Sequence, residues 1–179
     1  MQMQNQMIGF RRLSLEDMPN MHKWLTTDSE VKRTWGYAHQ GTYEEVISEF
    51  VGNVSGEELT EPYLILYGDT PIGYIQTFKW ADYPGYDQYV DLTDAASLDL
   101  FIGEEVYRNK GLGTVILSRF LREYVFADPH VARCIINPEV NNSAAIQLYE
   151  KLGFHIIGTF QDIPSEPGPV HFMSIEREN

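Results

Sequence analysis

The sequence predicts one α/β domain, and three observations carry that prediction. The chain has 179 residues, the size of one ordinary domain with a substantial core. Its hydrophobic content is 43% and its aromatic content 13%, as in globular rather than disordered proteins. In the middle of the chain, segments with strand alternation and segments with helical periodicity follow one another as β-α-β-α-β. We expect residues 1–7 to be a flexible N-terminus and residues 8–179 to form the domain.

The first third of the chain predicts one strand followed by two helices. IGFRRL, residues 8–13, has the composition of a strand. Ser14 with Asp17 three residues later is a weaker relative of the capping box and precedes apolar residues at helical spacing. Thr42 and Glu45 form a second N-cap signal before another set of apolar residues with the same spacing. Each helix is therefore expected to pack one face on a core.

The remaining strands are predicted from turn and alternation signals. PYLILY and PIGYIQTFKW flank the turn GDT, which indicates a hairpin of two strands. The strand SLDLFIG, residues 97–103, is expected to place on one face Leu98, Leu100 and Ile102, and on the other Ser97, Asp99 and Phe101. VARCIIN, GFHIIGTF and VHFMSIE are three further strands. Helices are expected over residues 111–126 and over SAAIQLYEKLG, where Gly153 is the C-cap.

Charge and composition argue against several classes of function. A net charge of −13 is unfavourable for general binding to nucleic acid or to an anionic membrane surface. No apolar run approaches the roughly 20 residues of a membrane helix, and the N-terminus lacks the regions of a signal peptide, so we expect a cytoplasmic protein. The single cysteine, Cys134, lies in an apolar run and is expected to be buried and inert. No spacing of Cys, His or carboxylates resembles a metal site, so no metal is expected.

An acidic run without Lys or Arg extends from Trp80 to Glu105. Its carboxylates are Asp82, Asp87, Asp91, Asp94, Asp99, Glu104 and Glu105. One interpretation is a solvated loop, and the other is an entrance that attracts a cation. The run begins at the hairpin strand that ends at Trp80 and leads into the strand that contains Asp99. Which interpretation holds depends on the function of these two strands.

The stretch YRNKGLGT, residues 107–114, joins a predicted strand to a predicted helix. Backbone N–H groups at such a helix N-terminus are well placed to bind phosphate oxygens. Gly111 and Gly113 allow close approach, while Arg108 and Lys110 supply positive charge on an otherwise acidic chain. An ordinary turn between strand and helix explains a short glycine loop about as often. The spacing excludes a P-loop and a dinucleotide-binding fingerprint.

Two motifs give the chain a resemblance to the GNAT acyltransferases. The pattern Arg108-x-x-Gly111-x-Gly113 resembles the pyrophosphate-binding signature of that family. Residues 137–154 resemble its segment N-x-x-A-x-x-x-Y-x-K-x-G-F, with matches at Asn142, Ala145, Tyr149, Lys151, Gly153 and Phe154. The resemblance covers nearly the whole chain, and within the family it is to the aminoglycoside 6'-N-acetyltransferases. It implies a GNAT fold, with a central mixed, mostly antiparallel sheet flanked by helices, and acetyl-coenzyme A as the acetyl donor.

The resemblance also implies roles for individual residues. Asp99 corresponds to the base and Tyr149 to the acid. The residues expected to bind acetyl-coenzyme A are Phe101, Ile102, Arg108, Asn109, Lys110, Gly111, Leu112, Gly113, Thr114 and Asn142. The residues expected to bind the acceptor are Trp35, Tyr37, Tyr74, Asp82, Asp87, Asp99 and Asn137. One departure concerns Asn137-Pro138, where several family members have Asp-Pro, so one acidic contact to a cationic sugar is missing at this position.

These residue types suit the acetylation of an amine. An alkylammonium with a pKa of about 10 is mostly protonated at neutral pH, so a carboxylate must hold the cation and help to remove a proton. A phenol within reach can donate a proton to the departing thiolate. Structural alternatives remain, because Asp99 can pair with a structural cation and Tyr149 can serve only to pack its ring. Trp35 and Tyr37 can likewise be packing residues.

The expected function is transfer of acetyl from acetyl-coenzyme A to a primary amine of a small cationic acceptor, by direct attack in a ternary complex. The favoured acceptor is the 6'-amine of an aminoglycoside. We expect no nucleic-acid or membrane partner and a monomer or homodimer. One alternative is acetylation of another amine, such as a polyamine, a siderophore precursor or a protein N-terminus. The other is binding of acetyl-coenzyme A without turnover.

Overall fold

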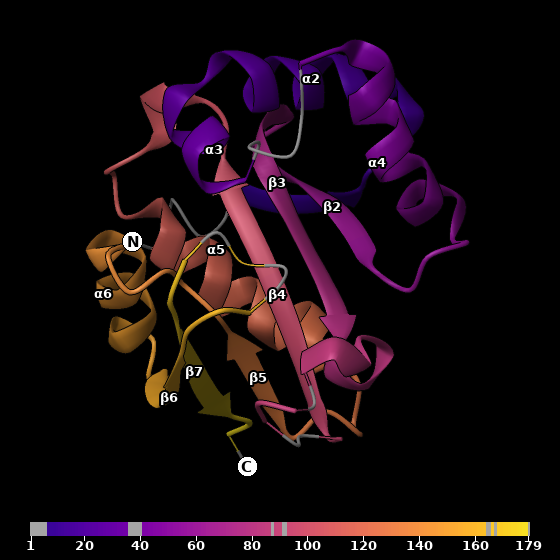
Figure 1. The fold of residues 1–179 in the computed structure, drawn as a ribbon. Helices are drawn as coiled ribbons and strands as arrows, with labels where there is room; N and C mark the ends of the chain where they lie inside the picture. Colours follow the sequence, from indigo (N-terminus) through magenta and orange to yellow (C-terminus); the bar gives the residue numbers. More distant parts are fainter. Residues whose placement is uncertain are drawn as a thin grey trace. The chain divides into compact units, whose positions relative to one another are not determined.

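In the part of the chain that the structure describes, seven strands form the sheet. They are β1 (Ile8–Arg12), β2 (Glu61–Tyr67), β3 (Thr70–Lys79), β4 (Ala95–Ile102), β5 (Arg133–Ile136), β6 (His155–Phe160) and β7 (Val170–Glu176). This computed structural model describes residues 7–35, 41–86, 88–90, 93–163, 166 and 168–178. The strands are hydrogen-bonded in the order β1-β2-β3-β4-β5-β7-β6 (Figure 1). Among the described pairings only β4 with β5 is parallel, so the expectation of a mixed, mostly antiparallel sheet is confirmed.

The helical elements come in α-helical and shorter forms. The α-helices are α2 (Met18–Thr27), α3 (Ser29–Thr34), α4 (Tyr43–Ser55), α5 (Leu112–Phe120) and α6 (Ser143–Lys151). The 3-10 helices are η1 (Leu15–Asp17), η3 (Trp80–Asp82), η4 (Pro84–Tyr86) and η5 (Glu105–Tyr107). A π-helical segment, η6 (Leu121–Val125), follows α5 directly.

The chain divides into two compact units. The first comprises residues 1–77 and 99–112, and the second comprises residues 78–98 and 113–179. Strand β4 contributes its C-terminal half to the first unit and its N-terminal half to the second. The prediction of a single domain over residues 8–179 stays a prediction.

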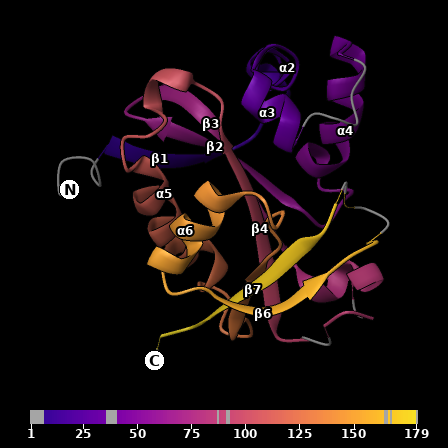
Figure 2. The ribbon, with the colours of Figure 1, turned by 60° about the vertical axis from the view of Figure 1, so that its left-hand side comes forward.

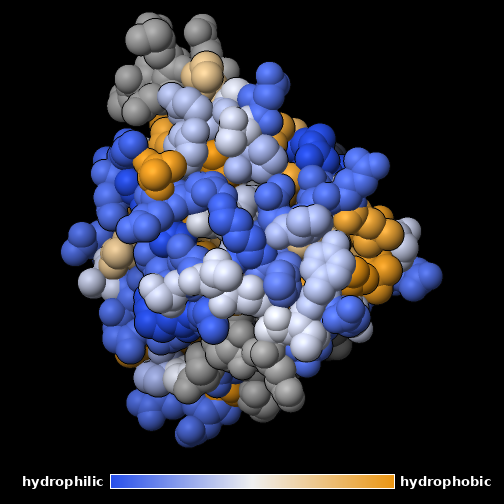
Figure 3. Space-filling view, turned by 90° about the horizontal axis from the view of Figure 1, so that it is seen from above, coloured by the Kyte–Doolittle hydropathy of each residue, from blue (hydrophilic) through white to orange (hydrophobic). Residues whose placement is uncertain are grey.

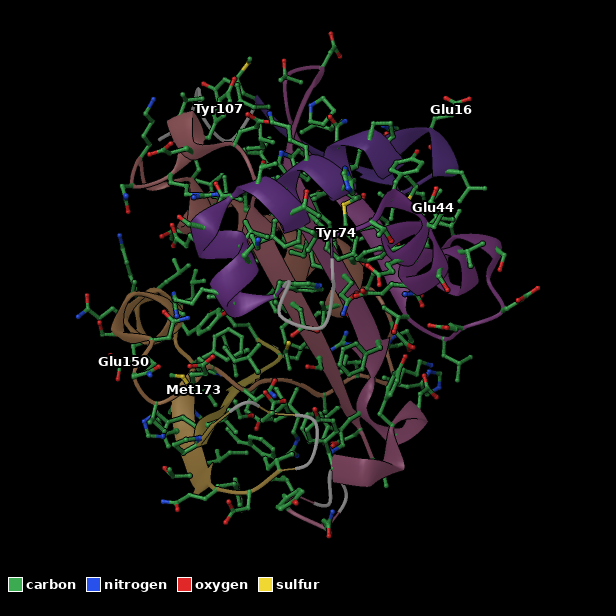
Figure 4. The ribbon with its side chains drawn as sticks, turned by 45° about the horizontal axis from the view of Figure 1, so that its top comes forward. Glu16, Glu44, Tyr74, Tyr107, Glu150 and Met173 are labelled. Carbon is green, nitrogen blue, oxygen red and sulfur yellow. The ribbon has the colours of Figure 1, made fainter. Side chains whose placement is uncertain are left out.

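In the first unit, α2, α3 and α4 bury their apolar sides in one core with residues of β2, β3 and β4. That core contains Leu13, Met18, Met21, Trp24, Leu25, Val31, Val46, Phe50, Leu64, Tyr74 and Phe101. Figure 4 shows Tyr74 between the strands and these helices, whereas Glu16 and Glu44 point outward. The face seen in Figure 3 is mostly polar, with apolar side chains only in scattered groups. The helices are therefore amphipathic, as their spacing predicted.

The start of α4 agrees with its predicted N-cap signal. Thr42 Oγ1 accepts from the Glu45 N–H at 3.2 Å, and Glu45 Oε2 accepts from the Thr42 N–H at 3.1 Å. The prediction of only two helices before the hairpin was wrong, because α3 is a separate helix. Asp28 ends α2 in an extended conformation, and its Oδ1 caps α3 by accepting from the N–H groups of Glu30 and Val31. An internal N-cap residue was the overlooked signal.

In the second unit, α5 and α6 lie side by side (Figure 2). The approach is close, because a Cβ on Gly113 would lie 3.0 Å from Cδ2 of Leu148. The helix predicted over 111–126 is confirmed in extent, because α5 and η6 together cover residues 112–125, but its C-terminal part is π-helical. Gly153 follows α6 with φ +99°, a left-handed conformation that ends the helix as predicted.

The side-chain alternation of β4 differs from the expected pattern. Leu98 is buried, but Leu100 and Ile102 on the expected apolar face are only half-buried. Phe101, on the face of Asp99, is buried instead and packs edge-to-face on Trp24 with ring centroids 6.0 Å apart. The helices of the first unit cover this face, which alternation alone did not reveal.

Candidate active site

Asp99 lies at the end of a hydrogen-bonded chain that crosses from β3 to β4. The Tyr74 hydroxyl donates to Oε1 of Gln76 at 2.7 Å, and Gln76 Nε2 donates to Oδ2 of Asp99 at 2.9 Å. Tyr74 and Gln76 are two positions apart on β3, so the pleat puts both side chains on one face. Because the tyrosine occupies the amide oxygen, the amide nitrogen faces the carboxylate.

The environment of Asp99 raises its pKa. Burial raises the pKa of the carboxyl above its ordinary value, and the hydrogen bond from Gln76 opposes that rise only in part. No Lys or Arg in the described part of the chain forms an ion pair with Asp99. The alternative of pairing with a structural cation therefore has no support among those residues. A carboxylate with these properties can hold an ammonium and accept its proton.

Aromatic rings pack around Tyr74, the first residue of this hydrogen-bonded series. The half-buried ring of Trp35 meets Tyr74 edge-on, with centroids 5.5 Å apart, and Phe101 at 5.4 Å. The ring of Phe50 also meets the ring of Tyr74 edge-on, with centroids 5.3 Å apart. Trp35 therefore packs on the core of the first unit beside Tyr74 and Phe101, and its acceptor role stays a prediction. Its predicted companion Tyr37 lies outside the described residues.

The assignment of Tyr74 to the acceptor surface needs correction. Its side chain is 0% exposed, and its hydroxyl is used on Gln76. Tyr74 therefore supports the carboxylate from behind and has no surface for a ligand. Gln76 was missed by the sequence analysis, although alternation along PIGYIQTF already placed a polar side chain on the face of Tyr74.

Strands β3 and β4 approach each other closely just beyond Asp99. A Cβ on Gly73 would lie 2.3 Å from the carbonyl oxygen of Phe101, so only glycine fits there. The Ile72 carbonyl accepts from the N–H groups of Gly103 and Glu104 at 2.9 and 3.1 Å. The carbonyl of Ile102, a predicted partner for coenzyme A, already accepts from Arg108 Nε at 2.7 Å.

The predicted pyrophosphate loop has two left-handed residues in alternate positions. Asn109 has φ 57° and Gly111 has φ 76°, and helix α5 begins at Leu112. Alternation of this kind points successive N–H groups to one side, an arrangement that binds anions. Asn109, Lys110 and Gly111 are exposed, whereas Leu112 is buried. Gly111 is needed for its φ, because a Cβ there would meet nothing within 4 Å.

Three other residues predicted to bind the cofactor lie in or beside this loop, namely Arg108, Gly113 and Thr114, and each has contacts within the protein or is partly buried. Gly113 is small because α6 packs on it through Leu148, and Thr114 is half-buried. The guanidinium of Arg108, expected to face the pyrophosphate, instead lies against Asp28, with Nη2 and Oδ2 2.8 Å apart. An arginine with a nearby carboxylate forms a charge-assisted pair. The cofactor role of Arg108 stays a prediction.

The predicted residues of the second unit are held by local contacts. Asn142 caps α6, since its Oδ1 accepts from the Ala145 N–H at 3.2 Å. Tyr149 is half-buried, and its ring packs on Phe154 with centroids 5.7 Å apart. The cofactor role of Asn142 and the acid role of Tyr149 stay predictions.

Asn137, where several family members have an acid, holds a carboxylate from elsewhere in the second unit. Its Nδ2 donates to Oε1 of Glu166 at 2.7 Å, and the Tyr86 hydroxyl donates to the same oxygen at 2.9 Å. The sequence analysis missed Glu166, because nothing local links it to a residue 29 positions earlier.

The acidic run is not simply a solvated loop. Its aromatic residues Trp80, Tyr86 and Tyr89 pack in the core of the second unit around Phe172. Asp82 is half-buried, and the predicted acceptor residue Asp87 and its neighbour Asp91 lie outside the described residues.

The described residues contain no group of three or more His, Cys, Asp or Glu side chains that could hold a metal ion. No helix in the same part of the chain has the length and apolar character needed to cross a membrane.

Comparison with known proteins gives matches at three levels. Residues 14–162 match the model of the acetyltransferase (GNAT) domain. Aminoglycoside N(6')-acetyltransferase type 1 of Klebsiella pneumoniae is 28% identical over 176 residues, covering 97% of this chain and 85% of the relative. The structure of aminoglycoside acetyltransferase AAC(6')-Ib with coenzyme A superposes with a TM-score of 0.80 at 29% identity, over 95% of each chain. Its complex with coenzyme A and kanamycin gives a TM-score of 0.81 at 28% identity, again over 95% of each chain.

Proposed function

The chain belongs to the GNAT acetyltransferase family, and from this we propose that it transfers acetyl from acetyl-coenzyme A to the 6'-amine of an aminoglycoside. The observation that carries the proposal is the hydrogen-bonded series of side chains Tyr74, Gln76 and Asp99. It presents a carboxylate of raised pKa that has no ion-pair partner among the described residues. Its chemistry suits a cationic amine.

The loop before α5 fits the donor. Left-handed Asn109 and Gly111 orient N–H groups for a pyrophosphate, and exposed Lys110 adds a positive charge. Bound acetyl-coenzyme A supplies the thioester that the amine attacks. The family likeness supports this donor, because the related AAC(6')-Ib was solved with coenzyme A.

Two residues handle the protons. Acetylation of R–NH3⁺ forms a C–N bond and breaks the C–S bond, and two protons leave the nitrogen. Asp99 holds the ammonium through its carboxylate oxygens and accepts a proton from it, directly or through water. The Tyr149 hydroxyl donates a proton to the departing sulfur and is protonated again, through water, by the second proton that leaves the nitrogen. Asp99 releases the first proton to solvent, so one proton ends on the thiol and one in solvent.

The acceptor preference has a further basis in the second unit. Asn137 has no charge, but Glu166 on its amide places a carboxylate at that position. We propose that this carboxylate replaces the acid that several family members have there, and that it attracts a second ammonium of the aminoglycoside. A polycationic acceptor also agrees with the acidic net charge of −13. A cytoplasmic location and a monomeric or homodimeric state remain part of this proposal.

A thiol-release assay over a panel of acceptors tests the proposal. The panel contains a kanamycin-type aminoglycoside, an otherwise similar aminoglycoside with a 6'-hydroxyl, a polyamine, a hydroxylamine and a peptide with a free N-terminus. We expect the highest kcat/KM on the 6'-amine compound and little activity on its 6'-hydroxyl counterpart. A higher kcat/KM on the polyamine or the peptide would show that this amine, and not the aminoglycoside, is the acceptor. Binding of acetyl-coenzyme A without thiol release on any amine would show that the protein binds the cofactor and is not an acetyltransferase.

A further inference from the structure

The guanidinium of Arg108 is almost fully engaged by the protein itself. Nε donates to the Ile102 carbonyl at 2.7 Å, and Nη2 donates to the Gly103 carbonyl at 3.2 Å. Nη2 also lies 2.8 Å from Asp28 Oδ2, and Nη1 lies 3.2 Å from Glu30 Oε2. Four contacts to the five N–H donors of a guanidinium leave one N–H for any other partner. The side chain is only 13% exposed.

From this geometry we infer that Arg108 and Asp28 are positioning residues, which set the affinity for coenzyme A by holding the start of its binding loop on helix α3. The inference rests on the proposed function, but it reassigns Arg108 within the glycine motif. Arg108 acts on the conformation of the loop, and its guanidinium makes no contact with the pyrophosphate.

Asp28 has two tasks that use different oxygens. Oδ1 caps α3 by accepting from the N–H groups of Glu30 and Val31, both at 3.0 Å, while Oδ2 holds Arg108. Burial acts to raise the pKa of this carboxyl, but the hydrogen bonds from Arg108 and the backbone outweigh it, and the pKa lies below its ordinary value. Asp28 is therefore charged throughout the neutral range and keeps the pair intact.

A second contact fixes the same segment of chain. Glu104 Oε1 accepts from Lys23 Nζ at 2.6 Å and from Trp24 Nε1 at 2.8 Å. Gly103 lies so close to Trp24 that a Cβ would be 2.3 Å from the indole. The segment that leads from β4 into the loop is thus attached to α2 through Glu104 and to α3 through Arg108.

Helix α3 connects this attachment with the aromatic rings around Tyr74. Its N-cap is Asp28 and its C-cap is Trp35, whose N–H donates to the Val31 carbonyl at 2.8 Å. Trp35 in turn packs on Tyr74 and Phe101 beside Asp99. A change in the pair is therefore transmitted to both the cofactor loop and these aromatic rings.

The charges agree with this assignment. Two carboxylates surround the guanidinium, so Arg108 adds little positive potential to the loop. Lys110 is exposed and has no ion-pair partner in the described ranges, so it is the residue that supplies charge to the phosphates. The two cations of the motif therefore have different functions.

Calorimetric titration with coenzyme A, and separately with ADP, tests the inference on Asp28→Asn, Arg108→Gln and the double variant. Asparagine retains an oxygen for the cap but loses the charge that pairs with Arg108. We expect each single variant to raise the Kd for both ligands about tenfold, which corresponds to about 1.4 kcal/mol. The double variant should bind no more than about twofold weaker than the poorer single variant, because the two residues act as one unit.

Controls separate positioning from direct contact. Glu30→Gln removes only the ion pair between Arg108 and the Glu30 carboxylate, whose side chain is 62% exposed. It should change the Kd for coenzyme A by at most about twofold. The salt dependence of Kd should fall in Lys110→Gln and stay at the parental slope in Arg108→Gln. Arg108→Lys should behave like Arg108→Gln, because an ammonium cannot make the forked contacts. Circular dichroism identifies a variant that does not fold. The folded variants then decide whether Arg108 positions the loop or contacts the phosphates directly.

The inference is overturned if Asp28→Asn binds both ligands like the parent while Arg108→Gln is weak, or if Arg108→Gln lowers the salt slope. Both results indicate direct contact between Arg108 and phosphate. Because no acceptor is present, a wrong acceptor assignment leaves this test unaffected. A parent protein that does not bind coenzyme A refutes the proposed function itself, and the inference with it.

Discussion

Gln76 Nε2 donates to Asp99 Oδ2 at 2.9 Å, and this bond from the neighbouring strand lowers the proton affinity of the carboxylate. It lowers the pKa of Asp99 against the larger effect of burial, which raises it. Removing the donor should therefore raise the pKa further.

We expect Gln76→Ala to shift the acidic limb of the pH profile of kcat/KM to higher pH and to lower the plateau. Tyr74→Phe removes only the hydroxyl that orients the amide and should give a smaller shift in the same direction. The measurement is kcat/KM for the acceptor from pH 5 to pH 9. An unchanged acidic limb in Gln76→Ala would show that the base is another group.

Asp99→Asn should lower turnover by about 10² to 10⁴, the usual range for loss of a general base. It should also stabilise the protein at neutral pH. A carboxyl whose folded pKa is raised contributes stability below its unfolded pKa, and that contribution is lost as pH rises through the folded pKa. The neutral amide avoids this loss.

Thermal unfolding at pH 7 and at pH 4 checks the second effect. The gain in Tm of Asp99→Asn over the parent should be clear at pH 7 and smaller at pH 4, because the raised pKa leaves less of the parental carboxyl ionised as the pH falls. A lower Tm of the variant at pH 7 would show that the carboxylate has a stabilising partner.

Gly111→Asp should abolish most of the affinity for coenzyme A. Gly111 has φ 76°, a conformation that costs other L-residues about 1–2 kcal/mol, and the added charge repels the phosphates. Gly111→Asn is the matched control, because asparagine adopts this conformation readily and is neutral. Calorimetry should place the Kd of Gly111→Asn between those of the parent and Gly111→Asp. Equal affinity in all three would remove the loop from the cofactor site.

Tyr149→Phe should reduce kcat more than it changes the Kd for coenzyme A. Phenylalanine keeps the ring that packs on Phe154 but has no proton for the leaving sulfur. Steady-state kinetics together with calorimetry separates the two quantities. A parental kcat would return Tyr149 to a packing role.

Asp82→Asn should raise the acceptor KM and weaken its salt dependence, while the KM for acetyl-coenzyme A stays nearly constant. The same result is expected for Asp87→Asn and Asp91→Asn, whose positions lie outside the described residues. Glu57→Gln, an exposed carboxylate outside the acidic run, is the control. If the acceptor KM at low salt matches the parent in all three variants, the run does not gather cations and a less charged amine becomes the better acceptor.

Much of the fold was predictable because its signals are local. The strands β6 and β7 and the capping box of α4 agree with the sequence analysis, since alternation and capping depend on residues a few positions apart. Helix α3 was missed because its six residues bury only Val31 and so show no apolar periodicity. The π-helical form of η6 was missed because its buried residues Leu121 and Val125 keep a helical spacing.

The site was predictable in its chemistry but not in its contacts. The motif around Gly111 and the strand position of Asp99 were sufficient to identify a family, because backbone geometry at a phosphate loop requires particular residues at particular spacings. They did not distinguish Arg108, whose charge is used within the protein, from Lys110, whose charge is exposed.

The sequence by itself determined the fold class, the loop that suits a pyrophosphate and a carboxylate in a strand, because each follows from local periodicity, glycine spacing and residue type. The tertiary structure decided that Gln76 holds Asp99, that Asp28 holds Arg108 and that Asn137 holds Glu166. The residues of these pairs are 23, 80 and 29 positions apart in the sequence. Hydrogen bonds between such distant residues form only after strands and helices have packed, so no local pattern specifies them.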